Sequence, residues 1–266
     1  MAVYAINQKF TAAPLLGADP APPGQSLPAL AGPASPWRRP DAPPSPAVFA
    51  IAEMFGIGLD ESSEVTVCDN LRLDLRRGDV VFVTGPSGSG KSVLLRALVA
   101  ALQAAEPRAR IVDLAMIAPP ADEAVIDGLG LPVAEALRLV SAAGLADAFL
   151  LLRRPRNLSD GQQWRLRLAH ALARLLDRSG GEATGEGPMP VLVADELAST
   201  LDRLCARAVA YRLRRIADER GITILAASAH DDLIEDLAPD VLVVKDPGSR
   251  ASVRYADPAR SKEGER

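Results

Sequence analysis

Eight consecutive residues of this chain have the types and order that bind a polyphosphate. They match the pattern G-x-x-x-x-G-K-[ST] and are Gly85, Pro86, Ser87, Gly88, Ser89, Gly90, Lys91 and Ser92. The glycines let consecutive backbone N–H groups turn toward the phosphates, and a following helix directs its positive N-terminus at the same charge. Lys91 would hold the β- and γ-phosphates, and Ser92 would ligate Mg²⁺. The pattern therefore predicts a nucleotide phosphate site.

The residues on either side of this loop predict the elements that would position it. Val80–Val83 is a short apolar run, as expected for a parallel strand that is buried on both faces. After the loop, Val93, Leu94, Leu95, Leu98 and Val99 continue as a helix with one apolar face. The order strand, glycine loop, helix is the context in which the pattern binds phosphate.

Two adjacent acidic residues follow a second apolar run. Residues 191–194 predict another buried strand, and Asp195 comes directly after it. Parallel sheets place their ligands at the carboxyl ends of strands, and a carboxylate there suits Mg²⁺. Asp195 is therefore a candidate metal-binding residue. In isolation, Asp195 and Glu196 could equally form a solvated strand end.

Between the glycine-rich loop and the acidic pair lies the sequence Leu158, Ser159, Asp160, Gly161 and Gln162. With the loop before it and the acidic pair after it, the chain resembles the ATP-binding cassette ATPases, whose signature is Leu-Ser-Gly-Gly-Gln. Asp160 replaces one glycine of that signature, and the resemblance spans about residues 49 to 254. It implies ATP and Mg²⁺ as ligands, hydrolysis of ATP, and a role for Glu196 in orienting and deprotonating the attacking water.

The resemblance also implies a head-to-tail homodimer. Ser159 and Gly161, with Gln162 of the same signature, would face the γ-phosphate bound by the other subunit. The segment 197–202 resembles the loop through which partners sense each other's nucleotide, and this makes Asp202 a coupling candidate. Asp202 could equally be the N-terminal residue of a helix, because a long amphipathic segment from about 201 to 220 begins there.

Two further residues are candidates because of their place in the motif order. His230 follows the apolar run 222–227 and resembles the switch histidine of the family, which contacts the γ-phosphate. A structural turn residue is the alternative. Phe55 lies about 30 residues before the loop, where the family stacks an aromatic ring on adenine. It could instead be a core or hinge aromatic. We interpret His170 as an ordinary helix-face residue.

One residue that the resemblance leads us to expect is missing. No glutamine occurs between Gln103 and Gln162, although the family carries one there that contacts Mg²⁺; the expected position holds Ala118, Pro119 and Pro120. In transporters this loop and the helical subdomain beside it receive the coupling helix of the membrane partner. Here the interval from loop to signature is also short, and both features favour a soluble stand-alone ATPase. A transporter subunit and a nucleotide-sensing module with little turnover remain alternatives.

Composition indicates a soluble, cytoplasmic protein. No apolar stretch approaches the roughly 20 residues of a membrane span, and the N-terminus does not resemble a secretory signal. The two cysteines, Cys68 and Cys205, have no metal-ligand spacing and are expected to be reduced thiols. The net charge of −4 gives no general electrostatic footprint for nucleic acid.

The expected fold class is α/β: a three-layer P-loop NTPase core with an N-terminal antiparallel β region that contains Val65–Leu75. Half of the 22 prolines lie in residues 1–48, which predicts a disordered leader, although the first ten residues could add a strand. The remaining assignments are an ATPase domain at 49–257, a helical subdomain at about 118–158 with helices at 121–129, 132–143 and 145–152, a flexible loop at 179–189 and a flexible tail at 258–266.

Overall fold

A computed structural model of the chain describes residues 2–11, 45–56, 64–176 and 187–257. Contacts divide the chain into two compact units, one of Met1–Gln8 with Val67–Arg266 and one of Lys9–Thr66. Within the described residues, no helix combines the length and the apolar character that a bilayer crossing requires.

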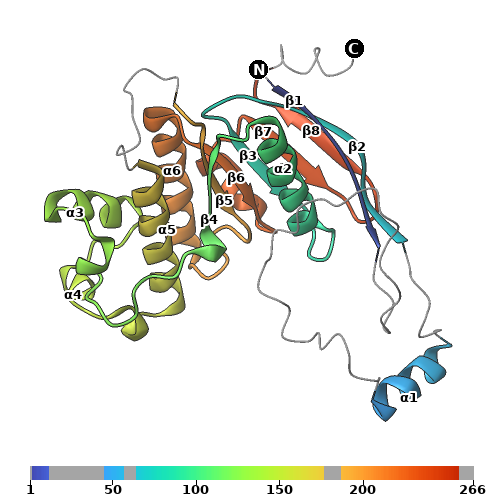
Figure 1. The fold of residues 1–266 in the computed structure, drawn as a ribbon, viewed down its shortest axis with the longest axis horizontal. Helices are drawn as coiled ribbons and strands as arrows, with labels where there is room; N and C mark the ends of the chain where they lie inside the picture. Colours follow the sequence, from blue (N-terminus) through green and yellow to red (C-terminus); the bar gives the residue numbers. More distant parts are fainter. Residues whose placement is uncertain (1, 12–44, 57–63, 177–186, 258–266) are drawn as a thin grey trace. The chain divides into compact units, whose positions relative to one another are not determined.

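The larger unit is built around a six-stranded sheet with the order β4-β5-β6-β3-β7-β8 (Figure 1). Every neighbouring pair is parallel except β7 and β8, which are antiparallel. The strands are β3 Val80–Thr84, β4 Arg110–Asp113, β5 Pro190–Ala194, β6 Thr223–Ala227, β7 Val241–Lys245 and β8 Ala251–Tyr255. The central strands β3, β5 and β6 are buried along their whole length, which explains their unbroken apolar runs.

Alternate residues of the central strands enter two separate cores, so the unit has three layers. Val80 and Phe82 of β3 pack in a core with residues of α5 and α6, whereas Val81 and Val83 pack in a second core with residues of α2 and β2. The helices are α2 Lys91–Ala105, α3 Val133–Ala142, α4 Ala148–Leu151, α5 Asp160–Leu176, α6 Arg203–Arg220 and α7 Ile234–Leu237. This arrangement confirms the expected three-layer α/β fold class.

The segment between β4 and α5 is less helical than expected. The helix expected over 121–129 is wrong, because only the short 3-10 turn η2, Asp127–Leu129, forms there. Gly128 disfavours a helix, and Gly130 ends the turn in the left-handed conformation with φ of 64°. The second expected helix is α3, and the third shortens to α4, where the side chain of Asp147 caps the N-terminus. The 3-10 turns η1 Leu114–Met116 and η3 Pro155–Asn157 flank these elements.

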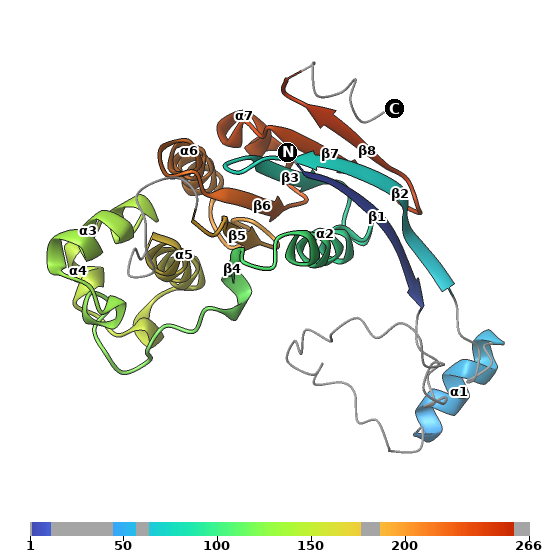
Figure 2. The ribbon, with the colours of Figure 1, turned by 45° about the horizontal axis from the view of Figure 1, so that its top comes forward.

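The N-terminal part of the chain contains two regular elements. Strand β1, Ala2–Thr11, pairs with β2, Glu64–Leu75, in a separate two-stranded sheet (Figure 2). The disordered leader expected over residues 1–48 is therefore wrong for these ten residues, and the alternative of an added strand is correct. Helix α1, Pro46–Phe55, begins at Ser45, whose side chain accepts a hydrogen bond from the amide of Val48. Residues 12–44, 177–186 and 258–266, which hold the rest of the leader, most of the expected loop and the tail, lie outside the described residues.

Candidate functional site

The glycine-rich loop joins β3 to α2, and close contacts require glycine at two of its positions. Gly85 has φ of 142°, and a Cβ atom on it would lie 2.1 Å from the backbone oxygen of Lys245. Gly90 has φ of 95°, and a Cβ atom there would lie 2.6 Å from Cγ1 of Val67. Both distances are shorter than any real contact of a Cβ atom. The loop therefore passes so close to β2 and β7 that only glycine fits at either position.

Two polar side chains in this loop fit a phosphate ligand. The ammonium of Lys91 donates hydrogen bonds to the carbonyls of Gly85 and Pro86, both at 2.8 Å, so it lies directly over the loop. The hydroxyl of Ser89 is buried and has no hydrogen-bond partner among the described residues. A buried hydroxyl without a partner costs free energy, and a phosphate oxygen would supply the partner. Both side chains can therefore offer donors to a phosphate bound at the loop.

Ser92 and Asp195 meet across the site. Ser92 lies in the first turn of α2, Asp195 follows β5, and the serine hydroxyl donates to Oδ1 of Asp195 at 3.0 Å. A hydroxyl and a carboxylate are oxygen ligands of the kind Mg²⁺ prefers. Within the described part of the chain, no group of three or more His, Cys, Asp or Glu side chains could hold a metal ion. A cation at this pair would therefore complete its coordination with phosphate and water oxygens, as Mg²⁺ commonly does.

The chain turns sharply after β5, and this turn exposes Glu196. Glu196 and Ala198 have φ of 53° and 57°, a conformation that costs a non-glycine residue about 1–2 kcal/mol. The amide of Glu196 donates to Oδ1 of Asp195 at 3.1 Å, and the amide of Leu197 donates to the carbonyl of Ala227 at 2.7 Å. The tie to Ala227 anchors the turn to the end of β6. Glu196 is therefore held by its backbone next to Asp195, and its side chain is exposed.

The segment after β6 is tied to the end of β3. The amide of Ser228 donates to the carbonyl of Val83 at 3.0 Å, and the hydroxyl of Thr84 donates to Oδ1 of Asp231. His230 lies between these ties, is exposed, and donates its own amide to Oγ of Ser228 at 3.2 Å. Strands β5, β6 and β3 are neighbours with parallel direction, so Asp195, Glu196 and His230 share one edge of the sheet with the loop. Sequence reasoning missed the Thr84–Asp231 pair, because nothing in the spacing of these residues links them.

The signature residues form the N-terminus of α5. The amide of Gln162 donates to Oγ of Ser159 at 3.4 Å, and the amide of Ser159 donates to Oε1 of Gln162 at 3.0 Å. This reciprocal pair is a capping box, so the side chain of Gln162 serves the helix itself. Asp160 is exposed in the first helical turn. Among the described residues, no hydrogen bond joins the signature to the glycine-rich loop of the same chain.

The segment that precedes α6 packs against the signature. A Cβ atom on Gly161 would lie 3.0 Å from the carbonyl oxygen of Thr200 and 3.1 Å from Cδ2 of Leu201. Oδ1 of Asp202 accepts a hydrogen bond from the amide of Cys205 at 2.9 Å and caps α6. Hydrogen bonds from the Cys205 side chain and amide lower the pKa of the Asp202 carboxyl. The helix-capping alternative for Asp202 is therefore correct, and its coupling role stays a prediction.

Two expectations concern residues outside this constellation. Phe55 is the last residue of α1, is 69 % exposed, and belongs to the unit Lys9–Thr66. Its stacking on adenine stays a prediction. Residues 118–120 follow η1 in an irregular segment, and β4 ends at Asp113, whose carboxylate accepts from the amide of Ala115 at 2.9 Å. Residues 118–120 are alanine and two prolines, so none of them has the amide side chain of the missing glutamine.

Comparison with known proteins agrees with this geometry. A family model described as ABC transporter matches residues 68–124. The chain is 31% identical over 200 residues to the aliphatic sulfonates import ATP-binding protein SsuB of Yersinia pestis, with 68% of each protein covered. The chain belongs to the ATP-binding cassette ATPase family. It is also 27% identical over 219 residues to the phosphonates import ATP-binding protein PhnC of Hyphomonas neptunium, with 68% of this chain and 78% of that protein covered.

A solved structure of an ATP-binding cassette shares the fold of this cassette ATPase. That structure is a dimeric post-hydrolysis state bound to ADP and Pi, and the likeness has a TM-score of 0.55 at 19% identity. It covers 73% of this chain and 93% of the other. Membership of the family makes this chain an ATP-binding and ATP-hydrolysing cassette, and the roles of the glycine-rich loop and the acidic pair in that site stay predictions.

Proposed function

We propose that this cassette ATPase hydrolyses Mg-ATP at a site completed by a second copy of the chain. The observation that carries the proposal is the hydrogen bond of 3.0 Å between Ser92 and Asp195, which joins the phosphate loop to the end of β5. It brings two oxygen ligands together, and the next residue in the chain is the exposed Glu196, whose amide donates to the same Oδ1 of Asp195. A cradle, a cation site and a base then follow one another along one edge of the sheet.

Each of these residues has a chemical task. The amides of the loop and the ammonium of Lys91 would bind the phosphates, and Ser92 with Asp195 would hold Mg²⁺, which neutralises phosphate charge when bound. Glu196 would accept a proton from the attacking water, and His230 would hold that water and the γ-phosphate in line. The turn after β5 fixes the backbone of Glu196 relative to Asp195, because the amide of Glu196 donates to the Asp195 carboxylate.

The second copy supplies the signature. Ser159 and Gly161 lie at the N-terminus of α5, where backbone amides attract phosphate, and they make no hydrogen bond to the loop of their own chain among the described residues. A head-to-tail homodimer would place them opposite the partner's nucleotide. The packing of Gly161 against Thr200 and Leu201 would transmit changes there to Asp202.

Phosphate release tests this proposal. Replacing Glu196 by Gln removes the base and should lower turnover by about 10² or more, while Mg-ATP still binds. The matched control is Glu235→Gln, which changes an exposed carboxylate of α7 and should leave turnover unchanged. Retained turnover in the Glu196→Gln protein would exclude Glu196 as the base. A wild-type protein that binds ATP without turnover would favour the nucleotide-sensing alternative.

A second candidate function is the ATP-binding subunit of an importer at the cytoplasmic face of a membrane. Two observations favour it over a stand-alone protein: the relatives SsuB and PhnC are named import ATP-binding proteins, and the helical subdomain exposes large apolar side chains. Met116 is 59 % exposed, Phe149 77 % and Leu152 75 %. A contiguous exposed apolar patch often marks a protein contact, and a coupling helix bound at this subdomain would cover these side chains.

Membrane association in the native host tests this second candidate. The wild-type chain should sediment with membranes, and the double variant Phe149→Ser with Leu152→Ser should remain in the supernatant with its ATP affinity intact. Neither residue belongs to the nucleotide site, so loss of membrane association would not reflect loss of ATP binding. A wild-type chain found only in the supernatant would exclude the importer and leave the stand-alone ATPase.

A further inference from the structure

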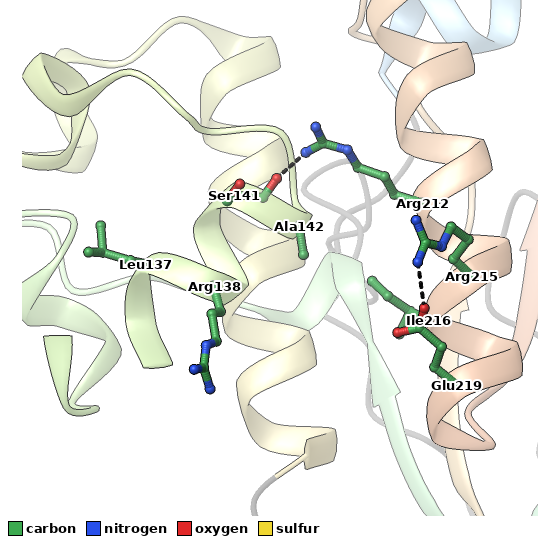
Figure 3. A pocket seen from close by; sticks show the side chains of 8 residues that line it. All are labelled: Leu137, Arg138, Ser141, Ala142, Arg212, Arg215, Ile216 and Glu219. Atoms are coloured by element: carbon green, nitrogen blue, oxygen red, sulfur yellow. Dashed lines mark hydrogen bonds and ion pairs between the residues drawn. The ribbon is translucent and has the colours of Figure 1, made fainter. Parts of the chain in front are cut away.

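A groove of about 480 Å³ separates α3 from α6 (Figure 3). One wall comes from the C-terminal half of α3 and the other from the C-terminal half of α6. The lining residues are Leu137, Arg138, Ser141, Ala142, Arg212, Arg215, Ile216 and Glu219. None of them belongs to the nucleotide site or to the segment between β4 and α3, so the groove is a separate feature of the fold.

Both walls of the groove include apolar lining residues. Leu137 of α3 is 42 % exposed although it is a large apolar residue, and Ala142 of α3 and Ile216 of α6 are half-buried. In Figure 3 the side chain of Ile216 extends from α6 toward the α3 side. An exposed apolar surface of this kind gains free energy when another apolar group covers it.

The charged residues of the groove are mostly positive. Nη2 of Arg215 and Oε1 of Glu219 form an ion pair at 2.8 Å, which leaves Arg138 and Arg212 without a neutralising carboxylate in the groove. Arg212 donates to the backbone carbonyl of Ser141 and so bridges the walls (Figure 3), but a carbonyl does not cancel its charge. Arg138 has no hydrogen bond or ion pair within the described residues. The groove is locally positive in a chain of net charge −4.

We propose that an acidic, amphipathic segment of a partner protein docks in this groove. Its carboxylates would pair with Arg138 and Arg212, and its apolar side chains would cover Leu137 and Ile216. Guanidinium groups suit carboxylates because their donors match both oxygens. The groove lies between two helices, and an amphipathic segment can lay its apolar face into a groove of this kind.

Hydrogen bonds connect the groove to the signature. Gly144 follows the end of α3, and its carbonyl accepts from Nη1 of Arg165 on α5 at 2.9 Å. Nε of the same arginine donates to the carbonyl of Gly161 at 3.2 Å. A segment that shifts α3 against α6 would therefore act on the signature through Arg165. We expect the docked segment to change ATP turnover while leaving the affinity for ATP unchanged, because the phosphate loop is not on this path.

Fluorescence anisotropy with the full chain tests the proposal. The probe is a fluorescein-labelled peptide of glutamate and leucine in helical repeat, about 12 residues or 18 Å long. The wild-type protein should bind it, and rising salt should weaken the complex. Arg138→Glu should weaken binding by about tenfold, and Leu137→Ser by about fivefold. Arg254→Glu makes the same charge change on exposed β8 and should bind like wild type.

Several results would overturn the proposal. These are no binding by the wild type, equal affinity of the Arg138→Glu and Arg254→Glu proteins, or equal binding of a lysine and leucine peptide. Vesicles of phosphatidylglycerol that bind in an Arg138-dependent way, without binding of the peptide, would assign the groove to lipid. Saturating peptide should change turnover by at least about twofold, and unchanged turnover would refute the link through Arg165. Because peptide binding is read without ATP, it is independent of the proposed hydrolysis.

Discussion

Replacing Gly85 by Ala should disable the phosphate loop through one backbone collision. The new Cβ atom would lie 2.1 Å from the carbonyl oxygen of Lys245, about 1 Å closer than any tolerated contact. Lys245 is fully buried at the end of β7, and its ammonium donates to the carbonyls of Asp246 and Gly248, so β7 cannot yield easily. Overpacking of this kind costs about 1–3 kcal/mol, and a positive φ adds about 1–2 kcal/mol. We therefore expect Gly85→Ala to lower the free energy of unfolding by about 2–5 kcal/mol.

Gly88 provides the matched control within the same loop. It has φ of 77°, but a Cβ atom on it would meet nothing within 4 Å. Gly88→Ala should therefore cost only about 1–2 kcal/mol from the backbone term. Urea unfolding gives the free energies, and titration with a fluorescent ATP analogue should show weaker binding by the Gly85→Ala protein. Equal unfolding midpoints and equal affinities of the two variants would refute the close approach of the loop to β7.

Three further predictions concern single side chains. Lys91→Ala should weaken Mg-ATP binding by about tenfold or more, because a point charge on the phosphates is lost; unchanged affinity in a titration would exclude that role. Asp160→Gly should strengthen the ATP-driven dimer by about two- to fivefold, since it removes a negative charge from the first turn of α5, and analytical ultracentrifugation measures this. Burial, with a smaller effect of Arg174, lowers the pKa of His170 below 6.5, so the unfolded chain binds more protons. Stability from this group is complete above about pH 6.5 and falls in acid. His170→Gln should reduce that fall in urea unfolding, and an unchanged pH profile would contradict it.

Much of the nucleotide site could be predicted from sequence because its parts are local. Each part is a short continuous segment: the loop is residues 85–92 and the acidic pair is residues 195–196. Each segment directly follows an apolar run that indicates a buried strand. Parallel strands then carry these parts to a common edge without any further signal. The capping role of Asp202 was also visible, since the long helix that follows it begins at that residue.

Contacts between distant segments could not be predicted. The pairing of Thr84 with Asp231, and the approach of Gly85 to Lys245, depend on the neighbours of β3 in the sheet, which periodicity does not reveal. The same holds for the full burial of the charged residue Lys245. The groove between α3 and α6 arises from the packing of two elements that are far apart in the sequence, so the spacing of its arginines does not indicate it.

The helix that local propensity predicted over residues 121–129 does not form. Residues 121–126 contain no proline or glycine, the residues that most disfavour a helix. However, Pro119 and Pro120 precede this segment and Gly128 lies near its end. The structure has only a 3-10 turn there, because irregular backbone bonds such as that from Val125 to the carbonyl of Arg153 replace a helical ladder. The amides of Val125 and Ile126 bond to the distant carbonyls of Arg153 and Leu151, whereas those of Asp127 and Gly128 bond locally to Ala124.

If a second copy of the chain completes the site, the assembly state of the Glu196→Gln protein must depend on ATP. In size-exclusion chromatography with light scattering, saturating Mg-ATP should convert this protein from monomer to dimer. Adding Ser159→Arg should abolish the dimer without weakening ATP binding by the monomer, because a long side chain would block the approach of the phosphate. A Glu196→Gln protein that binds ATP and remains a monomer would contradict the homodimer.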